Sequence, residues 1–106
     1  MYILYYLKII KNICQNKKIP LSGVIFPYLK RLSEYRDGEM DRYKEIIEVL
    51  DILNIDYIDL HKYLPEEDRY VLRKDRDDYS HPSIEGHEIA AGLIYKYLLE
   101  NYFKNR

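Results

Sequence analysis

Three segments of the chain repeat apolar residues at intervals of three and four positions, near residues 2–16, 41–53 and 84–103. This spacing places the apolar side chains on one face of a helix, with the charged residues on the others. We therefore predict three amphipathic helices. The first helix has an apolar stripe made of Ile3, Tyr6, Leu7, Ile10 and Cys14. This stripe needs a partner surface.

The ends of the second and third helices carry residues that commonly start or stop helices. Asp41 and Ser83 are expected N-caps, and Asn54 is suited to end the second helix in a left-handed conformation. In the third helix, Gly86 and Ala90 lie on the predicted packing face. Their small size would let this helix approach a sheet closely.

Two short apolar segments alternate with these helices and predict strands. Residues 22–26 are apolar in succession, which is typical of a strand covered on both faces, whereas residues 55–60 alternate between apolar and polar. A strand, a helix and a second strand within about forty residues form a βαβ unit, in which the strands are parallel. The pattern predicts one α/β domain over residues 1–106.

Composition and charge narrow the range of partners. The chain is 47% hydrophobic and 33% charged, as folded soluble domains are, and its net charge of -1 gives no reason to expect nucleic acid binding. The single cysteine excludes an internal disulfide and a site made of thiolates. The N-terminal apolar run has no basic residue before it and is interrupted by Lys8, so we expect no signal peptide, no membrane span and a cytoplasmic location.

The candidate chemistry lies in "DDYSHPSIEGHEIA", residues 77–90. Asp78 precedes His81 by three positions, close enough in a turn for its carboxylate to accept a hydrogen bond from Nδ1 of the imidazole. This contact would leave Nε2 free to take a proton, as the general base of a serine nucleophile must. Asp78 and His81 are therefore the candidate catalytic residues.

Simpler interpretations of the same residues remain open. A histidine in a polar loop beside a proline is usually solvated or caps a helix, and His87 is expected on a helix surface or in packing. A metal site made of Asp78, His81 and His87 lacks a further strong ligand at a characteristic spacing, so we expect no metal and no cofactor. The alternating charges of residues 73–77 predict a solvated loop.

The stretch "DYSHPSIEGHEIAAGLIYKYL" resembles the last sequence block of the SGNH (GDSL-type) hydrolases, in which an Asp-x-x-His-Pro turn precedes a glycine and a helix. The resemblance implies a flavodoxin-like three-layer α/β/α sandwich with a parallel sheet. This chain would supply the C-terminal part of that fold, with two parallel strands and about three helices. It also implies that His81 is the general base and that Asp78 orients it.

Other parts of the family pattern are not in this sequence. The family nucleophile lies in a Gly-Asp-Ser motif, and a glycine and an asparagine from the next two blocks complete the oxyanion hole. Ser22, Ser80 and Ser83 lack that context. We expect the base-bearing C-terminal part of a serine esterase or acyl hydrolase, inactive alone, that acts on an ester or acyl substrate once completed.

The alternative is a non-catalytic remnant or interaction subunit of the same fold. A two-stranded sheet leaves an unpaired inner edge, through which we expect the chain to self-associate.

Overall fold

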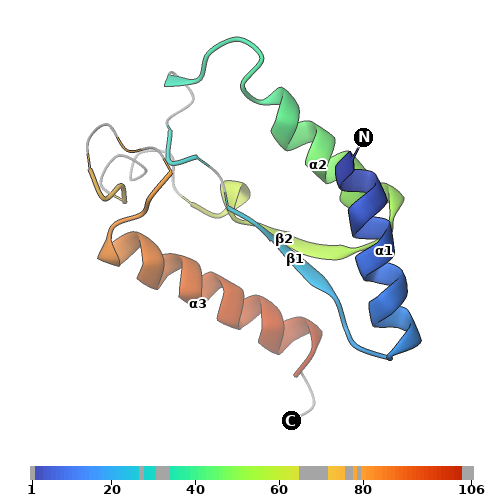
Figure 1. Cartoon of the computed structure of the whole chain (residues 1–106). Helices are drawn as coiled ribbons and strands as arrows, with labels where there is room; N and C mark the ends of the chain where they lie inside the picture. Colours follow the sequence, from blue (N-terminus) through green and yellow to red (C-terminus); the bar gives the residue numbers. More distant parts are fainter. Residues whose placement is uncertain are drawn as a thin grey trace. The chain divides into compact units, whose positions relative to one another are not determined.

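The computed structural model shows a mixed α/β chain (Figure 1). It describes residues 2–26, 28–30, 34–64, 72–75, 78 and 80–103. Along the described chain the elements are α1 (Tyr2–Asn16), β1 (Ser22–Ile25), α2 (Asp41–Ile52), β2 (Asp56–Asp59), the 3-10 helix η2 (Leu60–Lys62) and α3 (Ile84–Asn101). The predicted order of helices and strands is confirmed.

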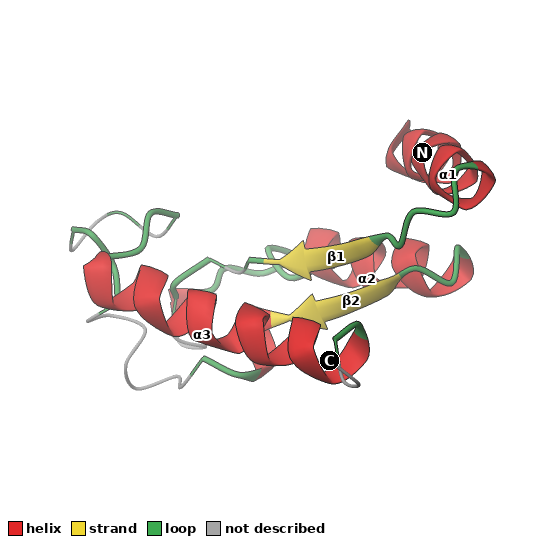
Figure 2. Ribbon diagram, turned by 90° about the horizontal axis from the view of Figure 1, so that it is seen from below, coloured by secondary structure: helices red, strands yellow, loops and turns green. Residues whose placement is uncertain are grey.

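The strands β1 and β2 are hydrogen-bonded neighbours in a two-stranded parallel sheet (Figure 2). The parallel arrangement predicted from the βαβ pattern is therefore confirmed. Among the described residues, each strand has one partner, so each has one edge without a neighbouring strand.

The chain divides into two compact units, which we describe separately. The first unit consists of Met1–Gly23 and Arg36–Tyr57, and the second of Val24–Tyr35 and Ile58–Arg106. The division passes through both strands. All of the candidate site residues belong to the second unit.

The first unit contains α1 and α2. On α2, Val49 and Leu50 are buried, and Asn54 follows the helix with a φ of 55°, which confirms the predicted left-handed exit. The N-cap prediction is wrong, since Met40 occupies that position and Asp41 is the first residue of the helix. The reason is the preceding turn, which leads straight into α2.

In α1 much of the apolar stripe remains uncovered. Ile3, Tyr6 and Ile10 are exposed, and Leu7 and Cys14 are half-buried. The amphipathic helix is present as predicted, but the described part of the first unit does not bury its apolar face.

The second unit has a core built from strand, loop and helix. Its buried members are Leu29, Ile58, Leu60, Leu64, Leu72 and Ala90, and half-buried residues of α3 pack against them. Ser83 caps α3 as predicted, because its hydroxyl accepts a hydrogen bond from the amide of Gly86 at 3.2 Å. Ile89, which falls in one row with Leu93 and Tyr97 at intervals of four residues, is exposed.

Gly86 allows α3 to approach the chain closely, but not at a sheet. A Cβ atom at this position would lie 2.7 Å from the carbonyl oxygen of Leu72 and 2.8 Å from Cβ of Pro82. The small residue is therefore required by contact with the segment before the helix. This close packing places the start of α3 against the loop that contains His81.

Candidate functional site

The turn at residues 78–82 is organised by the carboxylate of Asp78. Its Oδ1 accepts hydrogen bonds from the backbone amides of Ser80 at 3.2 Å and of His81 at 3.1 Å. An aspartate that accepts from amides two and three residues ahead closes a local turn without help from the rest of the chain. Asp78 therefore closes a local turn through the amides of Ser80 and His81.

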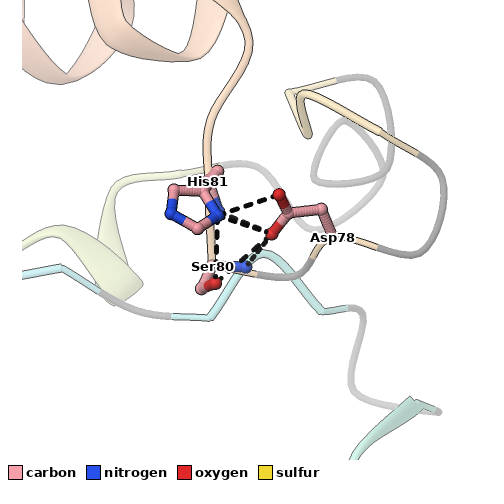
Figure 3. Close-up of polar contacts among 3 residues, drawn as sticks. All are labelled: Asp78, Ser80 and His81. Carbon is pink, nitrogen blue, oxygen red and sulfur yellow. Dashed lines mark hydrogen bonds and ion pairs between the residues drawn. The ribbon is translucent and has the colours of Figure 1, made fainter.

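Asp78 also contacts the side chain of His81. Its Oδ1 and Oδ2 lie 2.9 and 2.8 Å from Nδ1 of the imidazole (Figure 3). The predicted contact is confirmed. The other ring nitrogen, Nε2, lies on the side of the ring away from Asp78 (Figure 3). The side chain of His81 is 71% exposed, so this nitrogen belongs to an accessible imidazole.

The hydrogen bond from His81 lowers the pKa of Asp78 below its ordinary value. Desolvation of the carboxylate opposes this shift, while the amides of Ser80 and His81 and the charge of a protonated imidazole add to it. Asp78 is consequently ionised at neutral pH. An ionised carboxylate at Nδ1 favours the tautomer with the proton on Nδ1, which puts the lone pair on Nε2.

A short antiparallel pairing holds the turn in place. The amide of Lys74 donates to the carbonyl of His81 at 2.8 Å, and the amide of Ser83 donates to the carbonyl of Leu72 at 2.6 Å. The backbone from His81 to Ser83 is thus fixed to the segment at residues 72–74. This restricts the position of the candidate base.

That segment is anchored in turn by Arg73. Its side chain is only 1% exposed, its Nε donates to the carbonyl of Leu29 at 2.6 Å, and its guanidinium pairs with Glu34. Arg73 also forms an isolated bridge with Pro82. One buried side chain therefore connects the segment after β1 to the turn of His81.

The prediction of a solvated loop is wrong for Arg73. Lys74 and Asp75 are exposed as expected, while Arg76 and Asp77 lie outside the described residues. A guanidinium can donate several hydrogen bonds in one plane, so it satisfies a carbonyl and a carboxylate together when buried. Nothing in the local sequence separates Arg73 from its charged neighbours.

The serines named above do not occupy the position of a nucleophile. Ser80 Oγ lies 3.4 Å from Nδ1, the nitrogen that faces Asp78, whereas a nucleophile must face Nε2. Ser83 caps α3, and in the first unit the hydroxyl of Ser22 donates to the carbonyl of Asp56 at 3.2 Å. Ser33 lies outside the described residues.

An open pocket of about 310 Å³ lies beside this turn. The described residues that line it are Phe26, Tyr28, Ser80, Pro82 and His87. Two of them follow β1 and two flank His81, so the turn lies near the carboxyl end of β1, where ligands of open α/β sheets bind.

None of the five described lining residues was a candidate site residue in the sequence, although Ser80, Pro82 and His87 lie in the stretch at residues 77–90. Two aromatic residues directly after a predicted strand are the signal that could have indicated Phe26 and Tyr28. His87 is exposed on α3, as expected, and it also lines the pocket.

Comparison with known proteins gives no direct guide to the function. No family model matches the chain, and neither the curated proteins nor the solved structures include a significant match. Within the described ranges, no group of three or more acidic, histidine or cysteine side chains is arranged to hold a metal ion. No helix of the described residues is long and apolar enough to cross a membrane. The geometry around His81 is therefore the feature of this chain that bears on its function.

Proposed function

We propose that this chain carries the base-bearing part of a serine ester hydrolase of the SGNH type. The observation that carries the proposal is the contact of both Asp78 oxygens with Nδ1 of an exposed His81 imidazole. In this proposal, the two strands belong to the end of a three-layer α/β/α sandwich.

The chemistry assigned to His81 follows from its free nitrogen. Nε2 removes the proton of a serine hydroxyl as the serine oxygen attacks an ester carbonyl. His81 then gives this proton to the departing alcohol, and an acyl-serine remains. Water, deprotonated by the same nitrogen, then attacks the acyl-serine, the acyl group leaves as the carboxylic acid, and the proton held by His81 returns to the serine oxygen. Asp78 stabilises the imidazolium that forms in both steps.

The nucleophile and the oxyanion donors are assigned to a separate polypeptide segment. The sequence has no Gly-Asp-Ser motif, and neither Ser80 nor Ser83 faces Nε2. Since the serine forms the acyl intermediate and the oxyanion hole stabilises the developing charge, the 106-residue chain alone should be inert. The segment that supplies the nucleophile would also pair with an edge of the sheet that has no neighbouring strand among the described residues.

Labelling by a fluorophosphonate probe tests this function. The chain is expressed alone and together with the polypeptide encoded immediately upstream on the same strand. We expect labelling only in the second sample, on a serine of the added polypeptide, and its loss in His81→Ala but not in the control His61→Ala. Labelling that persists in His81→Ala would contradict the proposed base.

The second candidate function is that of an interaction subunit without catalysis. It is favoured by the exposed apolar residues of α1, Ile3, Tyr6 and Ile10, and by the open edges of the two-stranded sheet. Such a surface promotes association with another chain or a second copy. In that case a complex with the other chain would form, but His81→Ala would not change the fluorophosphonate labelling of that complex.

A further inference from the structure

The pocket beside His81 has an aromatic wall. Phe26 and Tyr28 both line it, and they remain 42% and 55% exposed. Large aromatic side chains gain free energy when they are covered, so two of them in one hollow favour an apolar ligand. The third apolar lining residue is Pro82.

Tyr28 makes two further contacts, neither of them with another described lining residue of the pocket. Its backbone carbonyl accepts a hydrogen bond from the hydroxyl of Tyr35 at 3.3 Å. The ammonium of Lys30 lies 5.9 Å from the centre of its ring. These contacts already restrict Tyr28 in the free protein. The entropic cost of ordering this residue when a ligand binds is therefore smaller.

The size of the pocket corresponds to an aromatic ring with a short substituent. A cavity of roughly 150 Å³ lined by apolar side chains holds one benzene molecule. At about 310 Å³, the pocket accommodates a ring together with an attached ester group.

The polar residues of the pocket indicate an uncharged ligand. The described lining residues include no Lys, Arg, Asp or Glu, so a charged group would find no counter-charge in the described wall itself. The charges of Lys30 and Asp78 already contact the lining residues Tyr28 and Ser80. The hydroxyl of Ser80 already contacts Asp78, and the phenol of Tyr28 and the imidazole of His87 are the other polar side-chain groups of the described lining residues.

From these observations we propose that the pocket binds the ring of an uncharged aryl ester. The ring lies against Phe26 and Tyr28, and Ser80 and Pro82 place the ester group next to the turn of His81. The assignment as a substrate site rests on the proposed function, whereas ring binding does not require His81 to act as a base.

Acetanilide, the amide counterpart of phenyl acetate, is the probe. Its binding to the 106-residue chain is followed by NMR through the ring signals of His87 and Phe26. N-methylacetamide lacks the ring, and 4-acetamidobenzoate adds a negative charge. We expect saturable shifts with acetanilide and at least fivefold weaker binding of each of the other two compounds.

Matched variants locate the binding. Phe26→Ala should weaken acetanilide binding at least fivefold, while Phe103→Ala, which removes a phenylalanine that is also 42% exposed, should change it less than twofold. Tyr28→Ala and Tyr63→Ala form a second pair, since these tyrosines are 55% and 59% exposed. Equal effects within both pairs, no saturable shift, or tighter binding of the charged compound would overturn the proposal.

The same titration on His81→Ala separates this inference from the proposed function. Acetanilide binding that stays within twofold supports a pocket that holds the ring independently of the base. If labelling of the completed enzyme does not depend on His81, the base assignment fails and the ring site still stands. Loss of acetanilide binding in His81→Ala would contradict a pocket built from the five described lining residues.

Discussion

The Nε of Arg73 lies 2.6 Å from the carbonyl oxygen of Leu29, and both side chains are almost completely buried. This hydrogen bond joins the segment after β1 to the segment that pairs with the His81 turn. The location of the candidate base therefore depends on a buried cation that contributes no chemistry of its own.

Replacement of Arg73 should strongly destabilise the fold. Arg73→Met leaves the carbonyl of Leu29 and the carboxylate of Glu34 without this donor, which should lower the free energy of unfolding by about 2–3 kcal/mol. Urea unfolding measures the change. The control is Lys74→Met, an exposed neighbour for which we expect a change within about 0.5 kcal/mol. Equal losses in both variants would show that Arg73 does not anchor the turn.

Two glycines of α3 should respond in opposite directions to alanine. Gly86→Ala places a Cβ 2.7 Å from the carbonyl oxygen of Leu72 and should cost about 1–3 kcal/mol of stability. Gly92 has no atom within 4 Å of the added Cβ, so Gly92→Ala should raise helix stability by about 0.5–1 kcal/mol. Thermal unfolding followed by circular dichroism measures the sign of the stability change in each variant. A gain of stability in both Gly86→Ala and Gly92→Ala would refute the close contact at Gly86.

The contact between Asp78 and His81 should contribute a pH-dependent part of the stability. Because folding lowers the pKa of Asp78, this contribution is present above the ordinary carboxyl pKa of about 4 and is lost as the pH falls through the lower folded value. The stability difference between the wild type and Asp78→Asn should therefore shrink below pH 4. Unfolding midpoints between pH 2.5 and 7 test this, with Asp75→Asn as the control. A difference that stays constant over the whole range would exclude the linkage.

Local patterns in the sequence were sufficient to predict the three α-helices, the two strands and the candidate pair, but not the 3-10 helix η2, whose first residue Leu60 was expected in the second strand. The helices follow from apolar spacing, and Asp78 reaches His81 because a turn of four residues brings them together. The role of Arg73 was not predictable in this way, since its acceptor Leu29 is 44 positions away. The pocket likewise combines Phe26 with His87, which only the folded chain brings to one surface.

The pairing of β1 with β2 was predictable from the βαβ order, but the cap of α2 was not. Asp41 has the residue type of an N-cap, yet its amide donates to the carbonyl of Gly38, whose φ of 82° shapes the preceding turn. That turn places Met40 at the cap position, and the carboxylate of Asp41 lies in the first turn of the helix. Such one-residue shifts depend on backbone conformations that residue preferences do not specify.

The tautomer of His81 tests most directly whether Asp78 prepares this imidazole to act as a base. Long-range proton–nitrogen NMR spectra of the neutral imidazole, recorded at high pH, distinguish a protonated Nδ1 from a protonated Nε2. We predict a proton on Nδ1 and a lone pair on Nε2 in the wild type, with a shift toward the other tautomer in Asp78→Asn. A wild-type His81 protonated mainly on Nε2, or a tautomer ratio unchanged in Asp78→Asn, would contradict the assignment of His81 as the base.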